Sequence, residues 1–265
     1  MIQGRLKGYV NRIVAEEQAG FRNGRSTIDQ IFMVRPLSEK FFEMNRTLYN
    51  NFIDFRQAFD SVWQKGLWQV LRNYRIPERL VILLEDLYSK SVNAVRVDME
   101  LTDWFEVTVS IWQGCNLSPY LFNLILEAMM QEALKNIDFG VQVCGEPVNN
   151  LRFADDIDLI TESHKKLQEL TNKVSESSKW FDLKINAEKT KVMVVGQQSR
   201  DMNIKLENER LEQVEDFTYL GSVMTADGKC VKDVKRRSGL TSAMVNKFSK
   251  LWRSNSISNK TEVKL

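Results

Sequence analysis

Three aspartates lie in apolar surroundings where an ionised carboxylate is costly. Asp155 and Asp156 are adjacent and have apolar residues on both sides. Asp54 ends a second short apolar segment, far away along the chain. A carboxylate in such a place needs solvent, hydrogen-bond donors or a cation to stabilise its charge. The three residues are therefore candidates for a cation site.

Each aspartate also has a structural interpretation. Asp155-Asp156 could form the tip of a β-turn, where Asp is common. Asp54 could cap a following helix, although Asp60 fits that position better. If two strands bring these carboxylates to one sheet edge, they could hold two divalent cations. Hard oxygen ligands suit Mg²⁺, with Mn²⁺ left open, and two such ions about 3.5–4 Å apart promote in-line displacement at phosphorus.

The composition indicates an ordinary globular protein and excludes several other classes. The chain has 265 residues, of which 43% are hydrophobic and 27% charged, enough for one large domain or two smaller ones. No apolar run approaches the ~18–20 residues of a membrane span, so we expect no membrane partner. A single histidine, His164, disfavours a serine–histidine relay or a histidine-based metal site. The three cysteines are widely spaced, which favours a reducing, intracellular location.

The charge is distributed unevenly along the chain. The net charge is +2, but residues 229–265 carry ten Lys or Arg against two Asp or Glu. Residues 1–25 carry five basic residues against two acidic ones, so residues 26–228 are net acidic. A basic end beside an acidic centre suits a protein that grips a polyanion and holds cations, although a solvated basic helix explains the C-terminal charge equally well.

Hydrophobic periodicity predicts a mixed α+β chain without the regular alternation of a doubly wound sheet. We expect helices over residues 28–48, with a kink or break at Pro36, and over 67–74, 80–89, 117–137, 162–182 and 232–252. We expect strands over residues 49–55, 93–97, 104–111, 141–143, 151–153, 157–160, 191–195 and 217–220.

Six segments together resemble the reverse transcriptases of non-LTR, LINE-like retrotransposons, among which the RTE type is one candidate. In order they are Glu17–Asp29 (EQAGFRNGRSTID), Asn51–Val62 (NFIDFRQAFDSV), Gln113–Asn123 (QGCNLSPYLFN), Phe153–Asp156 (FADD), Leu183–Val192 (LKINAEKTKV) and Phe217–Gly221 (FTYLG). The resemblance implies a right-hand polymerase fold with fingers, palm and partial thumb, and a ferredoxin-like antiparallel palm sheet. It places the reverse transcriptase domain at residues 1–228, with palm motifs at about 50–62, 106–195 and 215–222. The partial basic thumb then occupies residues 229–265.

The resemblance also assigns roles to individual positions. It makes Asp54, Asp155 and Asp156 the catalytic metal ligands and Lys189 the residue that protonates pyrophosphate. The implied dNTP-binding residues are Arg22, Arg25, Phe59, Gln113 and Gly114, and the implied primer grip is Tyr219, Leu220 and Gly221. Phe59 would be the steric gate against a 2′-hydroxyl. A core aromatic and a solvated lysine remain the alternatives for Phe59 and Lys189.

The implied function is RNA-directed DNA polymerisation, in which two Mg²⁺ ions act on dNTPs, an RNA template and a DNA primer. The endonuclease domain of such a polyprotein is missing from this chain, which resembles a fragment, and target-primed synthesis would occur in the nucleus. Trp112 stands where the family usually has arginine. This departure keeps an alternative open, in which a degenerate or domesticated copy binds nucleic acid without polymerising.

Overall fold

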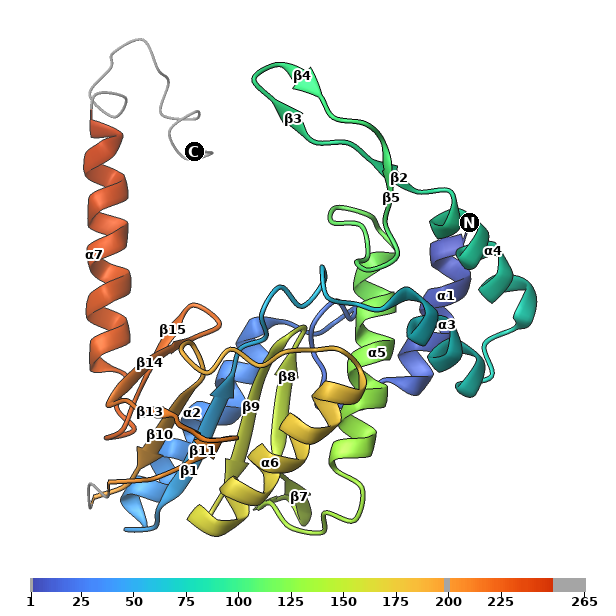
Figure 1. The fold of residues 1–265 in the computed structure, drawn as a ribbon. Coiled ribbons are helices and arrows are strands. Elements are labelled where there is room, and N and C mark those ends of the chain that lie inside the picture. The colour runs from blue at the N-terminus through green and yellow to red at the C-terminus, as the bar shows by residue number, and fades with distance from the viewer. Residues whose placement is uncertain (1, 198–200, 250–265) are drawn as a thin grey trace.

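A five-stranded sheet forms the centre of the computed structural model, which describes residues 2–197 and 201–249 (Figure 1). Across the sheet the order is β13 (Glu212–Gln213), β10 (Lys191–Val195), β1 (Leu48–Ile53), β9 (Asp156–Thr161) and β8 (Asn150–Phe153). All neighbours are antiparallel except β10 and β13. Because β1 lies between β10 and β9, its end comes to lie beside the β8–β9 hairpin.

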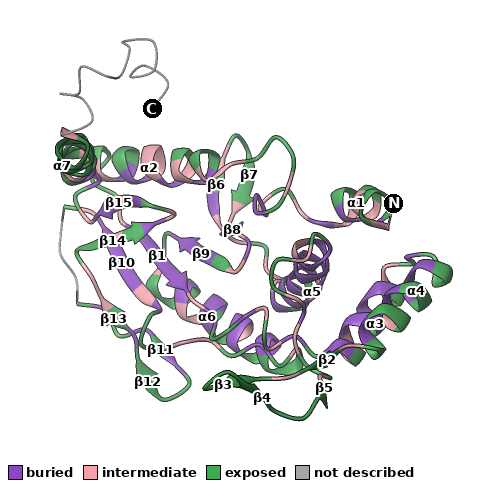
Figure 2. Cartoon of the chain, turned by 90° about the horizontal axis from the view of Figure 1, so that it is seen from above, coloured by how far each residue is buried: buried purple, intermediate pink, exposed green. Residues whose placement is uncertain are grey.

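Alternate side chains of β1 enter two separate hydrophobic cores, as the two-residue period of a strand requires. Tyr49 and Ile53 pack into the core that contains α6 (His164–Trp180), whereas Leu48 and Phe52 pack into the core that contains α2 (Thr27–Glu43). All six residues of the strand are buried as a result. Figure 2 shows the sheet between these two helices.

Helix α2 was expected to kink at Pro36 or to break there into two pieces; it does not break, and one helix contains this residue. Its start is stabilised where the Asp29 carboxylate accepts a hydrogen bond from the Ser26 N–H, at 2.7 Å. Pro36 cannot donate to the carbonyl of Phe32. The Phe32 side chain is 70% exposed, so this side of the helix is open to water, which can solvate the carbonyl.

Helix α5 (Ser118–Ala133) is the most enclosed helix of the described chain and joins the sheet to a helical layer. It packs against α6, α1 (Ile2–Ile13) and α3 (Gln64–Asn73), and α3 packs in turn on α4 (Glu78–Ser89). Its apolar residues face all round, which is the pattern of a helix buried in a core. The predicted helix over 117–137 is therefore confirmed, with an earlier end.

The remaining strands form short hairpins around the sheet. They are β2 (Val92–Asn93) with β5 (Phe105–Glu106), β3 (Arg96–Val97) with β4 (Glu100–Leu101), β6 (Val141–Val143) with β7 (Glu146–Val148), β11 (Lys205–Leu206) with β12 (Glu209–Arg210), and β14 (Asp216–Tyr219) with β15 (Ser222–Thr225). The strands expected over 93–97 and 104–111 are thus broken into shorter pieces.

Strands β2 to β5 form an arm of residues 92–106, here called the β2–β5 arm. This arm and helix α7 (Val231–Lys247) both project beyond the end of the sheet at which β1 ends and β9 begins (Figure 1). The expected helix over 232–252 is confirmed as far as Lys247, and its predicted end lies outside the described residues. No helix in residues 2–197 and 201–249 is long and apolar enough to cross a membrane.

Candidate active site

The strand register brings the three predicted aspartates to one end of the sheet. The last pairs of the ladder are Ile53 with Ile157 on β1 and β9, and Phe153 with Asp156 on β8 and β9. One residue further along antiparallel strands, Asp54 lies opposite Asp156. Asp155 lies in the two-residue turn between β8 and β9. Residues more than 100 positions apart are thus neighbours at one edge.

Burial and the charges of neighbouring aspartates raise the pKa values of Asp155 and Asp156. Partial desolvation, followed by the charges of Asp155 and Asp54, raises the pKa of Asp156 to about 6. Desolvation also raises the pKa of Asp155, and the charge of Asp54 adds to this effect. Like charges that cannot all be solvated disfavour full ionisation. The edge therefore favours occupation by a cation over three free carboxylates.

Asp54 has an unsatisfied oxygen at this edge. Its Oδ2 is buried and accepts no hydrogen bond from the described residues, although Lys189 Nζ lies 3.9 Å away. The backbone around Asp54 is fixed by the segment that carries Lys189, because the Asn186 N–H donates to the Asp54 carbonyl at 2.8 Å. A buried carboxylate oxygen that accepts no hydrogen bond, carried by a backbone held in place, has the properties of a metal ligand.

The described residues contain no ready-made group of three or more His, Cys, Asp or Glu side chains that could hold a metal ion. This does not disqualify the aspartate edge, because Mg²⁺ keeps several waters and is usually held by one or two carboxylates together with substrate phosphates. The acidic donors and the free oxygen of Asp54 fit such an ion. Lys189 is 70% exposed, and its Nζ lies beside Asp54.

A cavity of about 690 Å³ collects most of the predicted nucleotide-binding residues. Phe59, Gln113, Gly114 and Arg22 all line it. The Phe59 ring is stacked on Phe122, with ring centroids 4.4 Å apart and planes at 16°. This stacking fixes the ring as a rigid wall of the cavity. Gln113 is held by Asp60, whose carboxylate accepts a hydrogen bond from Nε2 at 3.0 Å.

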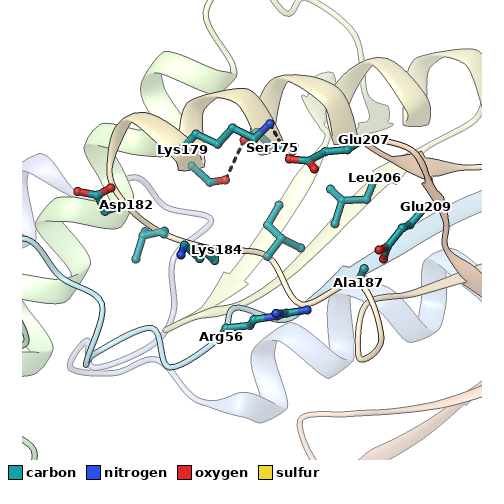
Figure 3. Close-up of a pocket in the computed structure, with 12 residues that line it drawn as sticks. Arg56, Ser175, Lys179, Asp182, Lys184, Ala187, Leu206, Glu207 and Glu209 are labelled. Carbon is teal, nitrogen blue, oxygen red and sulfur yellow. Dashed lines mark hydrogen bonds and ion pairs between the residues drawn. The ribbon is translucent and has the colours of Figure 1, made fainter.

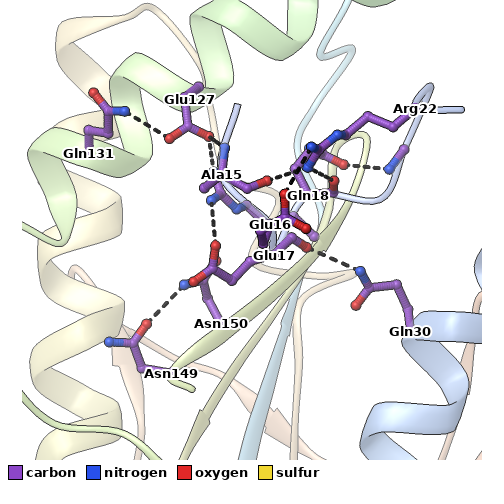
Figure 4. A network of polar contacts seen from close by, with 12 residues as sticks. Ala15, Glu16, Glu17, Gln18, Arg22, Gln30, Glu127, Gln131, Asn149 and Asn150 are labelled. Atoms are coloured by element: carbon purple, nitrogen blue, oxygen red, sulfur yellow. Dashed lines mark hydrogen bonds and ion pairs between the residues drawn. The ribbon is translucent and has the colours of Figure 1, made fainter. Parts of the chain in front are cut away.

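The two predicted arginines are engaged elsewhere. Arg22 is 9% exposed and donates from Nη1 to the carbonyls of Ala15 (2.7 Å) and Gln18 (3.1 Å). Arg25 forms an ion pair with Glu16 and is not among the residues that line the cavity. Arg22 therefore supports the wall of the cavity through the backbone of the preceding segment. Figure 4 shows this network, with Arg22 directed at the chain around Gln18.

Trp112, which stands where the resembled family usually has arginine, also lines the cavity. Its indole ring stacks on Tyr88 with centroids 4.4 Å apart, and its Nε1–H donates to Ser91 Oγ at 3.0 Å. Both interactions direct the indole toward α4 and the start of the β2–β5 arm. The cavity wall at this point is thus aromatic and carries no charge.

The predicted primer-grip residues form the β14–β15 turn. Leu220 and Gly221 both have positive φ, 48° and 80°, which is the conformation of a tight hairpin turn. Tyr219 is 2% exposed, and its ring lies 5.4 Å from that of Phe52 on β1. Desolvation, followed by the charges of Asp158 and Asp156, raises the pKa of the Tyr219 hydroxyl, so this hydroxyl lies near the acidic edge.

Some polar residues of the site were not assigned a role from the sequence. Asp158 is fully buried, and Asn50 donates to its Oδ2 at 2.9 Å. Gln18 is 1% exposed and contacts the turn that carries Asp155. Asn50 is a polar residue within a strand that is buried throughout, which is a signal for a buried hydrogen bond. Gln18 lay in a recognised motif, but nothing in the sequence identified its partner.

A second cavity, of about 430 Å³, lies between α6 and the β11–β12 hairpin (Figure 3). Arg56, Lys179 and Lys184 line it together with Asp182, Glu207 and Glu209, and Lys179 pairs with Glu207 at 2.5 Å. Its basic and acidic groups balance, so the lining does not select an anion.

Comparison with known proteins gives the same picture. Residues 1–224 match the family described as "Reverse transcriptase (RNA-dependent DNA polymerase)". A Pol polyprotein of the type-2 retrotransposable element R2DM of Drosophila melanogaster is 27% identical over 69% of this chain and 18% of its own length. The RNA-directed DNA polymerase of the mobile element jockey, from the same organism, is 24% identical over 83% of this chain and 24% of its own length. The chain thus spans about a fifth to a quarter of these relatives.

The fold is similar to that of telomerase structures. Apo telomerase from Candida tropicalis, truncated from its C-terminal domain, gives a TM-score of 0.62 at 14% identity, over 85% of this chain and 43% of that one. Telomerase from Candida albicans with a TWJ fragment of telomeric RNA gives 0.56 at 13% identity, over 86% and 38%. The likeness confirms the predicted right-hand polymerase fold with an antiparallel sheet.

Proposed function

Because this chain belongs to the reverse transcriptase (RNA-dependent DNA polymerase) family, we propose that it is the polymerase core of a non-LTR retrotransposon enzyme. It adds dNTPs to the 3′-hydroxyl of a DNA primer on an RNA template. The observation that carries this proposal is the register that sets Asp54 opposite Asp156, close to Lys189.

The aspartate edge holds two divalent cations in this proposal, with Asp54, Asp155 and Asp156 as their ligands. A divalent metal is a general requirement of the family. Two bound Mg²⁺ ions would supply charge stabilisation at the attacking and leaving oxygens of the displacement. The raised pKa values of Asp155 and Asp156 support this role, because a cation relieves the repulsion that causes part of them. Lys189 delivers a proton to the departing pyrophosphate.

The cavity beside the edge receives the incoming dNTP. Phe59 is the steric gate: its ring, fixed by Phe122, packs against the sugar and collides with a 2′-hydroxyl. Gln113 and Gly114 contribute polar and backbone groups to the wall. Gly114 has a φ of 80°, a conformation that suits glycine and leaves the backbone accessible.

The basic helix α7 contacts the backbone of the template–primer duplex. It carries five Lys or Arg, at positions 232, 235, 236, 237 and 247, against the single acid Asp233. Such contacts give affinity and salt dependence without sequence readout. The Tyr219–Gly221 turn at the foot of α7 supports the primer end. The RNA template, the primer and a nuclear site of action are parts of this proposal.

A second candidate function is nucleic-acid binding without polymerisation. Two observations favour it. Trp112 places an uncharged ring in the cavity wall where a cation was expected. Arg22, the only charged residue among those described as lining the cavity, donates to two carbonyls. A triphosphate would then find weak charge compensation, and binding would come from α7.

Primer extension on an RNA template with Mg²⁺ or Mn²⁺ separates the two candidates. We expect extension by the whole chain and its loss in Asp155→Asn. Asp138→Asn, which changes an exposed acid outside the site, should extend as the parent does. Salt-dependent binding of the duplex without any incorporation would favour the second candidate, and extension that survives Asp155→Asn would remove Asp155 from the catalytic site.

A further inference from the structure

We propose that Gln18 is a positioning residue, which holds the turn that carries Asp155 in the geometry needed to bind metal. Its carboxamide contacts the turn through both polar atoms. Gln18 Oε1 accepts a hydrogen bond from the Ala154 N–H at 2.8 Å, and Nε2 donates to the Ala154 carbonyl at 3.1 Å. The side chain is 1% exposed, so water does not compete for these bonds.

The turn needs such support because Ala154 has a strained backbone. Its φ is 56°, in the left-handed region that disfavours residues with a Cβ. A strained residue of this kind persists only where its surroundings fix it. The two hydrogen bonds from Gln18 pair the N–H and the carbonyl of this one residue. They therefore constrain the direction in which the next residue, Asp155, leaves the turn.

Gly20 allows the segment of Gln18 to come this close. A Cβ at position 20 would lie 2.1 Å from the Ala154 nitrogen, which is a backbone atom and cannot move aside. The Gly20 N–H also donates to Gln18 Oε1 at 2.7 Å, which fixes the carboxamide in place. Glycine at this position is required by the packing against Ala154.

The segment itself is held on two sides by buried groups. The Ala19 N–H donates to the carbonyl of Arg152 on β8 at 2.8 Å. Gln18 and Arg152 thereby form a parallel bridge, which adds the segment to the edge of the sheet. From α5, Asn123 Nδ2 donates to the Gly20 carbonyl at 2.9 Å, and Glu127 Oε2 accepts from the Ala15 N–H at 3.1 Å. Gln18 thus transmits the rigidity of α5 and β8 to the aspartate turn.

This inference rests on the proposed metal site, but its measurements need no DNA synthesis. The test variant is Gln18→Leu, which removes the contacts to Ala154. The matched control is Gln30→Leu: Gln30 is also a buried glutamine, and its Nε2 donates to the Glu17 carbonyl of the same segment at 3.1 Å without contacting the turn. Both variants lose buried hydrogen bonds, so a merely structural effect would appear in both.

The first measurement is the affinity for Mn²⁺, followed by electron paramagnetic resonance of the free ion, with Asp155→Asn marking the loss of the site. We expect Gln18→Leu to weaken binding about tenfold or more, as removal of outer support does at other metal sites, and Gln30→Leu to stay within about twofold of the parent. Equal affinities in the two folded variants would overturn the proposal.

The second measurement does not require any variant to fold. Hydrogen–deuterium exchange is measured at single-residue resolution in the metal-free parent protein. The Ala154 amide should exchange slowly, because its N–H donates a buried hydrogen bond to Gln18 Oε1. Exchange at the rate of an unprotected amide would overturn the proposal. This result is independent of polymerisation, so a chain that extends no primer can still pass or fail it.

Discussion

Lys189 Nζ lies 3.9 Å from Asp54 Oδ2, at the edge where β1 meets the β8–β9 hairpin. Asp54 Oδ2 itself is buried, but the Asp54 side chain as a whole is 34% exposed and Lys189 is 70% exposed, so the ion pair contributes little to stability. Its position matters for chemistry instead. The ammonium can reach a group bound at Asp54 without displacing any buried contact.

Lys189→Ala should therefore lower kcat for primer extension by about 10²-fold or more, the usual contribution of a general acid. The melting temperature should stay unchanged. Lys184→Ala is the control, because it removes an exposed lysine of the same segment that lines the second cavity. Single-nucleotide incorporation under pre-steady-state conditions measures the effect, and an equal loss in both variants would exclude a specific role for Lys189.

The pKa of about 6 at Asp156 gives a pH dependence with a definite sign. The folded, metal-free protein binds this proton more tightly than the unfolded chain, whose carboxyl titrates near 3.8. The free energy of unfolding therefore falls as the pH rises from about 4 to about 6. Above that range, the stabilisation from protonated Asp156 is lost completely. Asp156→Asn should stabilise the metal-free protein at pH 7.5 and have no such effect at pH 3.5, as measured by urea denaturation.

The affinity for a metal ion should also depend on the titration of Asp156, but it should rise with pH where the stability of the metal-free protein falls. The ligands must be deprotonated to bind, so Mn²⁺ affinity should fall as the pH drops through 6. Asp138→Asn serves as the control for both measurements. An affinity that does not change between pH 5 and pH 7.5 would mean that Asp156 is not a ligand.

The Phe59 ring should discriminate between deoxyribose and ribose. Phe59→Val opens the space beside the sugar, so the ratio of kcat/KM for dNTP over rNTP should fall by about 10- to 200-fold, the usual scale for a steric pocket. The loss of stacking on Phe122 will also cost some stability. Phe105→Val on the exposed arm is the control. If the ratio of kcat/KM for dNTP over rNTP does not change in Phe59→Val, Phe59 only packs in the core and does not select the sugar.

Asp233 fastens α7 to the rest of the protein. It is the only buried residue of the described helix, and its carboxylate accepts from Arg35 at 2.8 Å, the Val223 N–H at 2.9 Å and Ser222 Oγ at 3.0 Å. Desolvation opposes ionisation, but these donors outweigh it and lower the pKa to about 2. The stability from this group is therefore present above pH 4 and is lost as the pH falls toward 2.

Asp233→Ala should remove the carboxylate that holds the part-buried Arg35, the Val223 N–H and Ser222 Oγ, and should cost about 1–3 kcal/mol in the free energy of unfolding. Deuterium exchange should accelerate throughout α7 and not in α6. Duplex binding should weaken as well, because the basic groups of α7 lose their fixed direction. Asp227→Ala, in the loop before α7, is the control. If the α7 amides exchange at the same rate in Asp233→Ala as in Asp227→Ala, Asp233 does not anchor the helix.

The sequence predicted the parts of the site that belong to regular elements. The apolar strand before Asp54 and the apolar hairpin around Asp155-Asp156 had clear local patterns, and the resemblance of their motifs implied roles that stay predictions. Antiparallel pairing then required only that the two segments be neighbours. The long helices were predicted well for the same reason, because burial on one face leaves a period that can be read locally.

The parts that escaped prediction depend on contacts between distant segments. No local pattern says that Gln18 meets Ala154, or that the Arg22 guanidinium turns back to the Ala15 and Gln18 carbonyls. The β2–β5 arm was expected as longer strands because its residues alternate. In the structure most of them are exposed and pair only over two residues at a time.

The contact between Gln18 and Ala154 joins residues 136 positions apart, and this separation has a consequence for folding. Contacts of such long range form slowly, because closing the long intervening loop costs conformational entropy before the contact stabilises anything. The β8–β9 hairpin can pair early, since its strands are adjacent in sequence. Its turn takes its final shape only when the N-terminal segment docks, so we expect refolding protein to regain sheet content before it regains the ability to bind metal.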